Sequence, residues 1–123
     1  MRSVRRLVLG FAVTAALALS ATSAFAHAHL ETSMPAANAT VTSPSMITLH
    51  FTEALEPRFS GFEITDSTGH GVNAPPHVDP SNAAILMAMP ATALAPGVYH
   101  VNWHIVAHDG HRMRGAFDFT VRA

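Results

Sequence analysis

Prolines and glycines divide this chain into short segments, and this feature excludes most helical folds. All eight prolines lie between residues 35 and 96, and glycines interrupt the chain further at residues 61, 69, 71, 97 and 110. Proline removes a backbone donor and clashes inside a helix, and glycine weakens helices and strands alike. Few of the remaining windows carry apolar side chains at helical spacing. We therefore expect no long helix.

Apolar and polar side chains alternate in several of the segments that remain. Residues 46–53 place Ile47, Leu49 and Phe51 on one face and polar residues on the other. A period of two is typical of antiparallel strands with one buried face. Residues 97–106 and 115–121 alternate in the same way, and the weaker strand candidates are residues 27–33, 59–67 and 83–89. Residues 69–82 are expected to form a long irregular loop.

Six or seven short strands in a chain of this size predict an all-β fold. The expected architecture is a two-sheet Greek-key β-sandwich or barrel of about seven strands. Its predicted core consists of the inward-facing apolar residues Leu30, Ile47, Leu49, Phe51, Phe62, Ile64, Ile85, Met87, Trp103, Ile105, Phe117 and Phe119. Sandwiches host many functions, so this pattern alone assigns none.

Residues 1–26 have the three zones of a secretory signal peptide. Three arginines open the chain, residues 7–19 are apolar and uncharged, and Ala24-Phe25-Ala26 offers a cleavage site between small residues. An apolar stretch of this length, at about 1.5 Å per residue, falls well short of a hydrocarbon core about 30 Å thick. We expect cleavage after Ala26, which leaves one domain, residues 27–123, beginning at His27 and without a membrane span.

The expected mature chain is acidic and rich in histidine. Three of the seven basic residues belong to the predicted leader, so four arginines face eight carboxylates and the net charge is −4 with histidine neutral. This balance argues against nucleic acid as a partner. All nine histidines fall after residue 26, and the absence of cysteine excludes disulfides and thiolate metal sites.

Metal-competent side chains follow two of the predicted strands. The buried face that contains Ile105 continues to Asp109 and His111, and the face that contains Phe51 continues to Glu53. These side chains either leave the sandwich at its rim or build a site there. A buried carboxylate is costly unless it is paired or bound to a metal, so we expect them exposed, paired or coordinating.

A histidine at a free amino terminus offers two metal-binding nitrogens in one residue. An α-amine has a pKa of about 7.7–8.0, so a divalent cation displaces its proton near neutral pH. Amine and imidazole nitrogens suit Cu(II), whereas calcium and magnesium prefer oxygen. His29 leaves an alternative open, because the amine, two amides and the third residue's imidazole also chelate Cu(II). That chelate needs deprotonated amides, which a strand would engage in hydrogen bonds.

The sequence resembles the CopC family of periplasmic copper-binding proteins. The resemblance spans nearly all of residues 27–123 and rests on His27 at the predicted terminus, Pro35-Ala36, "LHFTEALEP" and "DGHxxxGxFxF" from Asp109 to Phe119. It implies a cupredoxin-like, immunoglobulin-like fold. It also implies a Cu(II) site made by the amine and imidazole of His27, a carboxylate oxygen of Asp109 and the imidazole of His111, with Glu53 close by. From its position in the sequence, we expect His29 to be a neighbouring or auxiliary group.

The resemblance predicts a non-enzymatic protein of copper homeostasis or resistance. It would buffer copper or deliver it, with an inner-membrane copper importer as the expected partner. Some family members bind Cu(I) through a methionine-rich loop, but residues 69–83 contain histidines and no methionine, so we expect no such loop site. Two other functions remain open: a small copper monooxygenase with a histidine-brace-like site, and a sandwich interaction module whose histidines bind no metal.

Overall fold

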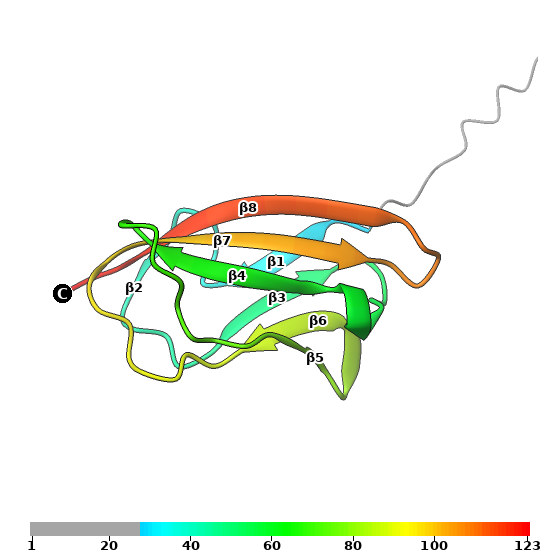
Figure 1. Ribbon diagram of the computed structural model, residues 1–123, viewed down its shortest axis with the longest axis horizontal. Helices are drawn as coiled ribbons and strands as arrows, with labels where there is room; N and C mark the ends of the chain where they lie inside the picture. Colours follow the sequence, from blue (N-terminus) through cyan, green and yellow to red (C-terminus); the bar gives the residue numbers. More distant parts are fainter. Residues whose placement is uncertain (1–27) are drawn as a thin grey trace, which may run out of the picture.

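A computed structural model describes residues 28–123, which form two facing β-sheets (Figure 1). The predicted leader and His27 lie outside the described residues. The strands are β1 (Leu30–Met34), β2 (Thr40–Val41), β3 (Ile47–Phe51), β4 (Gly61–Asp66), β5 (His77–Asp79), β6 (Asn82–Ala88), β7 (Gly97–Val106) and β8 (Arg112–Val121). One short 3-10 helix, η1 (Pro57–Phe59), precedes β4.

The two sheets contain four strands each, and the chain passes from one sheet to the other several times. One has the order β1-β3-β6-β5 and the other β2-β8-β7-β4. All pairs are antiparallel except β2 with β8. The predicted all-β sandwich is thus confirmed. Between residues 28 and 123 no helix is long and apolar enough to cross a membrane.

The core lies between the sheets and is closed by aromatic contacts. Phe51 of β3 meets Trp103 of β7 edge to face, with ring centroids 5.2 Å apart. Tyr99 stacks on Phe119 at 5.4 Å. Each large side chain that becomes fully buried contributes about 1.5–3 kcal/mol. Of the predicted core, the residues found buried are Ile47, Leu49, Phe51, Phe62, Ile64, Trp103, Ile105 and Phe119, while Leu30 and Phe117 are partly buried against it.

The prediction for β6 was wrong by one residue. Ile85 and Met87 were expected inside, but Leu86 and Ala88 are fully buried instead. Side chains directly opposite in an antiparallel pair share a face, and Leu86 lies opposite the buried Leu49 of β3. The outward residues Ile85 and Met87 are therefore only half-buried.

The expected loop at residues 69–82 is partly ordered as a strand. Residues 77–79 form β5, which pairs with β6 through a tight turn at Pro80-Ser81. In that turn the Asp79 carboxylate accepts hydrogen bonds from the backbone N–H and the hydroxyl of Ser81. With the two-residue β2, this strand raises the number of strands to eight, against the six segments predicted from the sequence.

Gly115 of β8 allows the indole of Trp103 to lie against the sheet. The two residues are directly opposite in the β7–β8 pair. A Cβ at residue 115 would stand only 2.3 Å from Cζ2 of Trp103. Carbon atoms in contact prefer about 3.5–4.0 Å, so no larger side chain fits here without displacing the ring.

Candidate metal centre

The β7–β8 connection is a tight turn that presents Asp109 and His111. Strand β7 ends at Val106, and the N–H of Ala107 then donates to the carbonyl oxygen of His111 at 2.8 Å. The N–H of Gly110 donates to the carbonyl of Ala107, also at 2.8 Å. Gly110 has a φ of +91°, a left-handed conformation that favours glycine. The conformation of the turn therefore explains why a glycine lies between Asp109 and His111.

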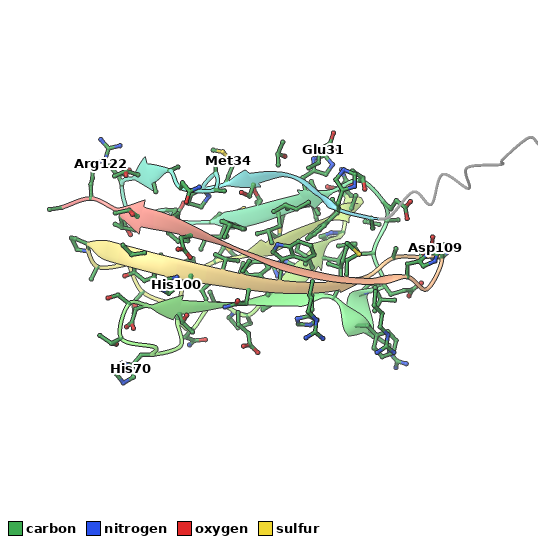
Figure 2. The ribbon with its side chains drawn as sticks, turned by 90° about the horizontal axis from the view of Figure 1, so that it is seen from above. Glu31, Met34, His70, His100, Asp109 and Arg122 are labelled. Atoms are coloured by element: carbon green, nitrogen blue, oxygen red, sulfur yellow. The ribbon has the colours of Figure 1, made fainter. Side chains whose placement is uncertain are left out.

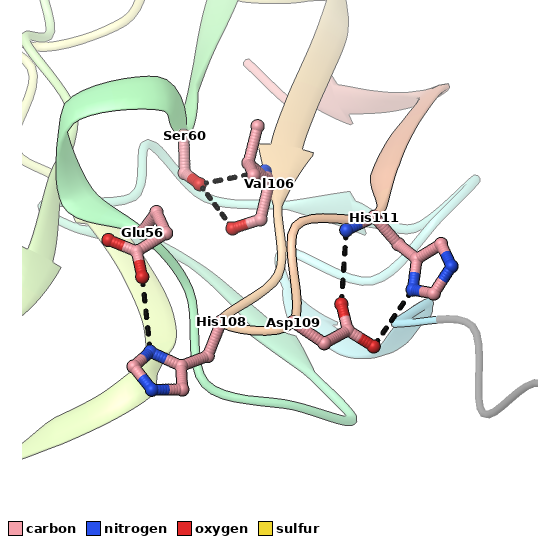
Figure 3. Close-up of polar contacts among 6 residues, drawn as sticks. All are labelled: Glu56, Ser60, Val106, His108, Asp109 and His111. Carbon is pink, nitrogen blue, oxygen red and sulfur yellow. Dashed lines mark hydrogen bonds and ion pairs between the residues drawn. The ribbon is translucent and has the colours of Figure 1, made fainter.

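Asp109 and His111 form a close pair at the tip of this turn (Figure 3). One carboxylate oxygen of Asp109 accepts the backbone N–H of His111 at 3.0 Å, and the other lies 2.8 Å from Nδ1 of its ring. The side chains are about half exposed, at 46% for Asp109 and 47% for His111. An imidazole that donates its Nδ1 proton to a carboxylate carries its lone pair on Nε2, the arrangement common in metal-binding histidines.

These contacts favour the ionised form of Asp109. The backbone N–H of His111, followed by its ring, lowers the pKa of the Asp109 carboxyl below the ordinary 3.8, and the small desolvation opposes this. Hydrogen bonds to the charged form favour ionisation. The turn therefore offers a negative oxygen donor beside an imidazole throughout the neutral pH range.

Residues 52–56 connect this turn to the start of the described chain. At one end of the segment, the N–H of Thr52 donates to the carbonyl of His29 at 3.0 Å, and Thr52 Oγ1 accepts the N–H of His29. In the middle of the segment, the carbonyl of Ala54 accepts the N–H of His108 at 2.9 Å. Ala28 is fully buried, which anchors the chain one residue after His27.

The same arrangement is visible at the scale of the whole molecule. In Figure 2 the N-terminal end of β1 and the turn that carries Asp109 lie at the same end of the sandwich. Leu55, which is buried, bridges to Ala107 at the base of the turn. Glu53 lies within the connecting segment and is half-buried. The start of the described chain and the Asp109–His111 pair thus lie at one end of the fold.

The structure describes two of the three predicted ligands. Asp109 and His111 are brought together, but as exposed turn residues and not as a continuation of the buried face of β7. Within residues 28–123, no three His, Cys, Asp or Glu side chains form a group that could hold a metal ion, so Glu53 and His29 do not complete one. His27, the third predicted ligand, lies outside the described residues.

His29 is an exposed residue whose backbone is held by Thr52, the residue that follows β3. Its N–H donates to Thr52 Oγ1 at 3.0 Å, while β1 proper begins one residue later at Leu30. A chelate through the first three residues would have to deprotonate this amide and break that hydrogen bond. This contact favours a site built with Asp109 and His111 over the local chelate.

Other histidines pair with carboxylates in ways that the sequence did not reveal. On the outer face of the second sheet, Nδ1 of His100 lies 2.6 Å from a carboxylate oxygen of Asp118. His108 is an exposed surface residue, and its Nδ1 lies 3.1 Å from Glu56 (Figure 3). The sequence indicates that His100 faces outward on β7, but its partner Asp118 can be found only from the β7–β8 register.

Comparison with known proteins identifies the family. The sequence profile of the CopC domain matches residues 30–122. The chain is 41% identical to protein YobA of Escherichia coli K12, covering 81% of this chain and 82% of that protein. It is 38% identical to copper resistance protein C of Xanthomonas campestris pv. juglandis, covering 89% and 91%. The chain belongs to the CopC family.

Solved structures of relatives share the fold. The crystal structure of CopC from Methylosinus trichosporium OB3b superposes with a TM-score of 0.71 at 33% identity, covering 78% of this chain and 94% of that one. PcoC, a methionine-rich copper resistance protein from Escherichia coli, gives a TM-score of 0.71 at 32% identity, covering 79% and 100%. The cupredoxin-like β-barrel implied by the sequence resemblance is confirmed.

Proposed function

We propose that this protein is an exported copper carrier that holds one Cu(II) at the end of the sandwich formed by the β7–β8 turn. The ligands in this proposal are the amine and imidazole of His27, the imidazole of His111 and a carboxylate oxygen of Asp109. The supporting observation is that residues 52–56 hydrogen-bond both to His29 and to the turn that carries the Asp109–His111 pair.

The relatives support copper as the cargo. Two similarly related proteins are named copper resistance protein C, from Escherichia coli and Pseudomonas syringae pv. tomato. Copper transport protein CutJ of Bacillus subtilis is 28% identical over 79% of this chain, which matches only 18% of its length. In that relative, a CopC-like segment is therefore part of a much longer transport protein.

The donor set and its exposure suit exchange of Cu(II). Nitrogen donors with one carboxylate match the preference of this ion, and the half-exposed pair leaves access for a second protein to take the metal. Oδ2 of Asp109 lies on the Nδ1 side of the His111 ring in the described structure, so coordination of one ion by both Asp109 and Nε2 of His111 requires this contact to open. Glu53 contributes negative charge beside the site, and His29 remains an auxiliary group.

The biological role that follows is buffering or delivery of copper in the periplasm. Residues 1–26 would direct export and be removed, and an inner-membrane importer would receive the metal. Reduction of bound copper would not be part of this role, so catalysis is not proposed. A monooxygenase would instead produce peroxide or oxidised product with added reductant, at rates well above those of free copper.

The chain supplies a matched control for the experiment. His100 and Asp118 are also a half-exposed histidine–carboxylate pair, but they lie away from the turn with Asp109 (Figure 2). Competition titration with a Cu(II) chelator should show one tight site in the exported protein. His111→Ala should weaken it by more than about 100-fold, beyond the usual loss for an outer-shell partner, whereas His100→Ala should leave it unchanged. Equal losses in both variants, or no stoichiometric site, would contradict the proposal.

A further inference from the structure

The arginines of this acidic domain are concentrated in one place. Residues 28–123 contain four arginines and eight carboxylates. Three of the four, Arg58, Arg112 and Arg114, line a single hollow of about 400 Å³ on the outer face of the β2-β8-β7-β4 sheet. The fourth, Arg122, lies at the opposite end of the molecule from Asp109 (Figure 2). The hollow is therefore a local positive surface on a chain whose overall charge is negative.

The positions of these arginines follow from the strand register. Arg112 and Arg114 are two residues apart in β8, so both project from the same face of the sheet. Directly opposite them on β7 are Val106 and His104. Arg58 comes from η1, whose preceding residue, Glu56, donates its N–H to the carbonyl of Val106 at 2.8 Å. Two distant segments thus place three cations around one hollow.

The guanidinium groups form no ion pair with any residue that the structure describes. Among the described residues every ion pair joins a histidine to a carboxylate, and none includes an arginine. Arg58, Arg112 and Arg114 are all exposed. Their charges are therefore available to a ligand, and clustered positive charges attract anionic groups before contact.

The surface around the hollow is larger than a small anion needs. A second hollow continues along β7 and β8, shares His104 and Arg114 with the first, and contains one carboxylate, Glu63. At the rim of the first hollow, the side chain of Phe59 is 59% exposed. Apolar surface beside cations suits a polypeptide, which can contribute both carboxylates and apolar side chains.

We propose that this arginine surface, defined by Arg58, Arg112 and Arg114 with Phe59, docks an acidic segment of a partner protein. Arg112 follows His111 directly in sequence, so the docked partner would lie beside the candidate copper site. The purpose of this docking, copper transfer, rests on the proposed function, but the binding itself does not. Complementary charge would orient the partner, since the rest of the domain repels it.

The test uses the exported protein stripped of copper and a fluorescein-labelled oligoglutamate peptide as the probe. Anisotropy should show saturable binding that weakens as NaCl rises from about 50 to 500 mM, because salt screens exposed charges. The triple variant Arg58→Ala, Arg112→Ala, Arg114→Ala should bind the peptide about tenfold or more weakly, since three exposed ion pairs are removed. Arg122→Ala removes one charge at the far end and should change binding by less than about twofold.

The outcomes separate this proposal from the proposed function. Peptide binding that is absent, or that falls as much in Arg122→Ala as in the triple variant, would overturn the docking surface. Citrate that binds the same surface as tightly as the peptide would overturn the assignment to a protein segment. Copper titration of the triple variant should match that of the unmodified protein. If neither protein binds copper, that result would count against the proposed copper site and not against the docking surface.

Discussion

Replacing Gly115 by alanine would place a methyl group inside the van der Waals surface of the Trp103 indole. The added Cβ would lie 2.3 Å from Cζ2 and 2.6 Å from Cε2, about 1 Å inside the usual contact distance of about 3.5 Å. The ring has little room to retreat, because Trp103 is only 8% exposed and packs edge-on against the buried Phe51. The substitution must therefore displace packed aromatic side chains.

The expected cost follows from two opposing effects. Overpacking costs about 1–3 kcal/mol, and a rigid ring against backbone belongs in the upper half of that range. Alanine also restricts the unfolded chain, which returns about 0.4–1 kcal/mol. The net loss in unfolding free energy should be about 2 kcal/mol, equivalent to a fall in Tm of about 8–16 °C for a domain of this size.

Urea unfolding followed by the fluorescence of Trp103, the single tryptophan, measures this loss directly. Gly71→Ala is the matched control, because a Cβ there meets nothing within 4 Å. In a Trp103→Leu background, with unfolding followed by circular dichroism, the cost of Gly115→Ala should drop below about 0.5 kcal/mol. An unchanged or higher stability of Gly115→Ala in the unmodified protein would refute the contact argument.

Three further predictions concern β6 and the copper site. Leu86→Ala should lower the unfolding free energy by about 2–4 kcal/mol and Ile85→Ala by much less, as measured by urea unfolding; the reverse order would contradict the observed register. His29→Ala should leave Cu(II) affinity within about threefold in a chelator competition, whereas a loss as large as that of His111→Ala would favour the local chelate. Copper affinity should fall as pH drops from about 7.5 to 5, because imidazole and amine nitrogens gain protons there. The pKa of Asp109 is lowered below 3.8, so its carboxylate stays ionised in this range and Asp109→Asn should retain the same pH dependence; a flat profile in the variant would contradict this.

The sequence predicted the fold where polar residues mark the outward face. In β3 and β7, threonine, histidine and asparagine alternate with large apolar residues, so the buried face could be assigned. Strand β6 lacks this information, because residues 83–89 are entirely apolar and either face could be inward. Its register is decided by pairing with β3, where Leu49 meets Leu86. Such long-range pairing is not encoded in local periodicity.

The site was predictable in its residue types but not in its construction. A tight turn that presents an oxygen and a nitrogen donor needs a glycine between an aspartate and a histidine. The structure places Asp109, Gly110 and His111 in such a turn. The role of Thr52 and Ala54 was not predicted, because their hydrogen bonds to His29 and His108 join segments far apart in the chain. Loop pairings of that kind depend on the assembled sandwich.

The central claim is that a free amine on His27 completes a copper site with Asp109 and His111. The most direct test compares Cu(II) affinity and the copper EPR spectrum of the protein that begins at His27 with those of a form carrying one extra residue before it. The account predicts one tight site with nitrogen and oxygen donors in the first form, and a loss of affinity greater than about 100-fold in the second. Equal affinities and identical spectra would contradict it.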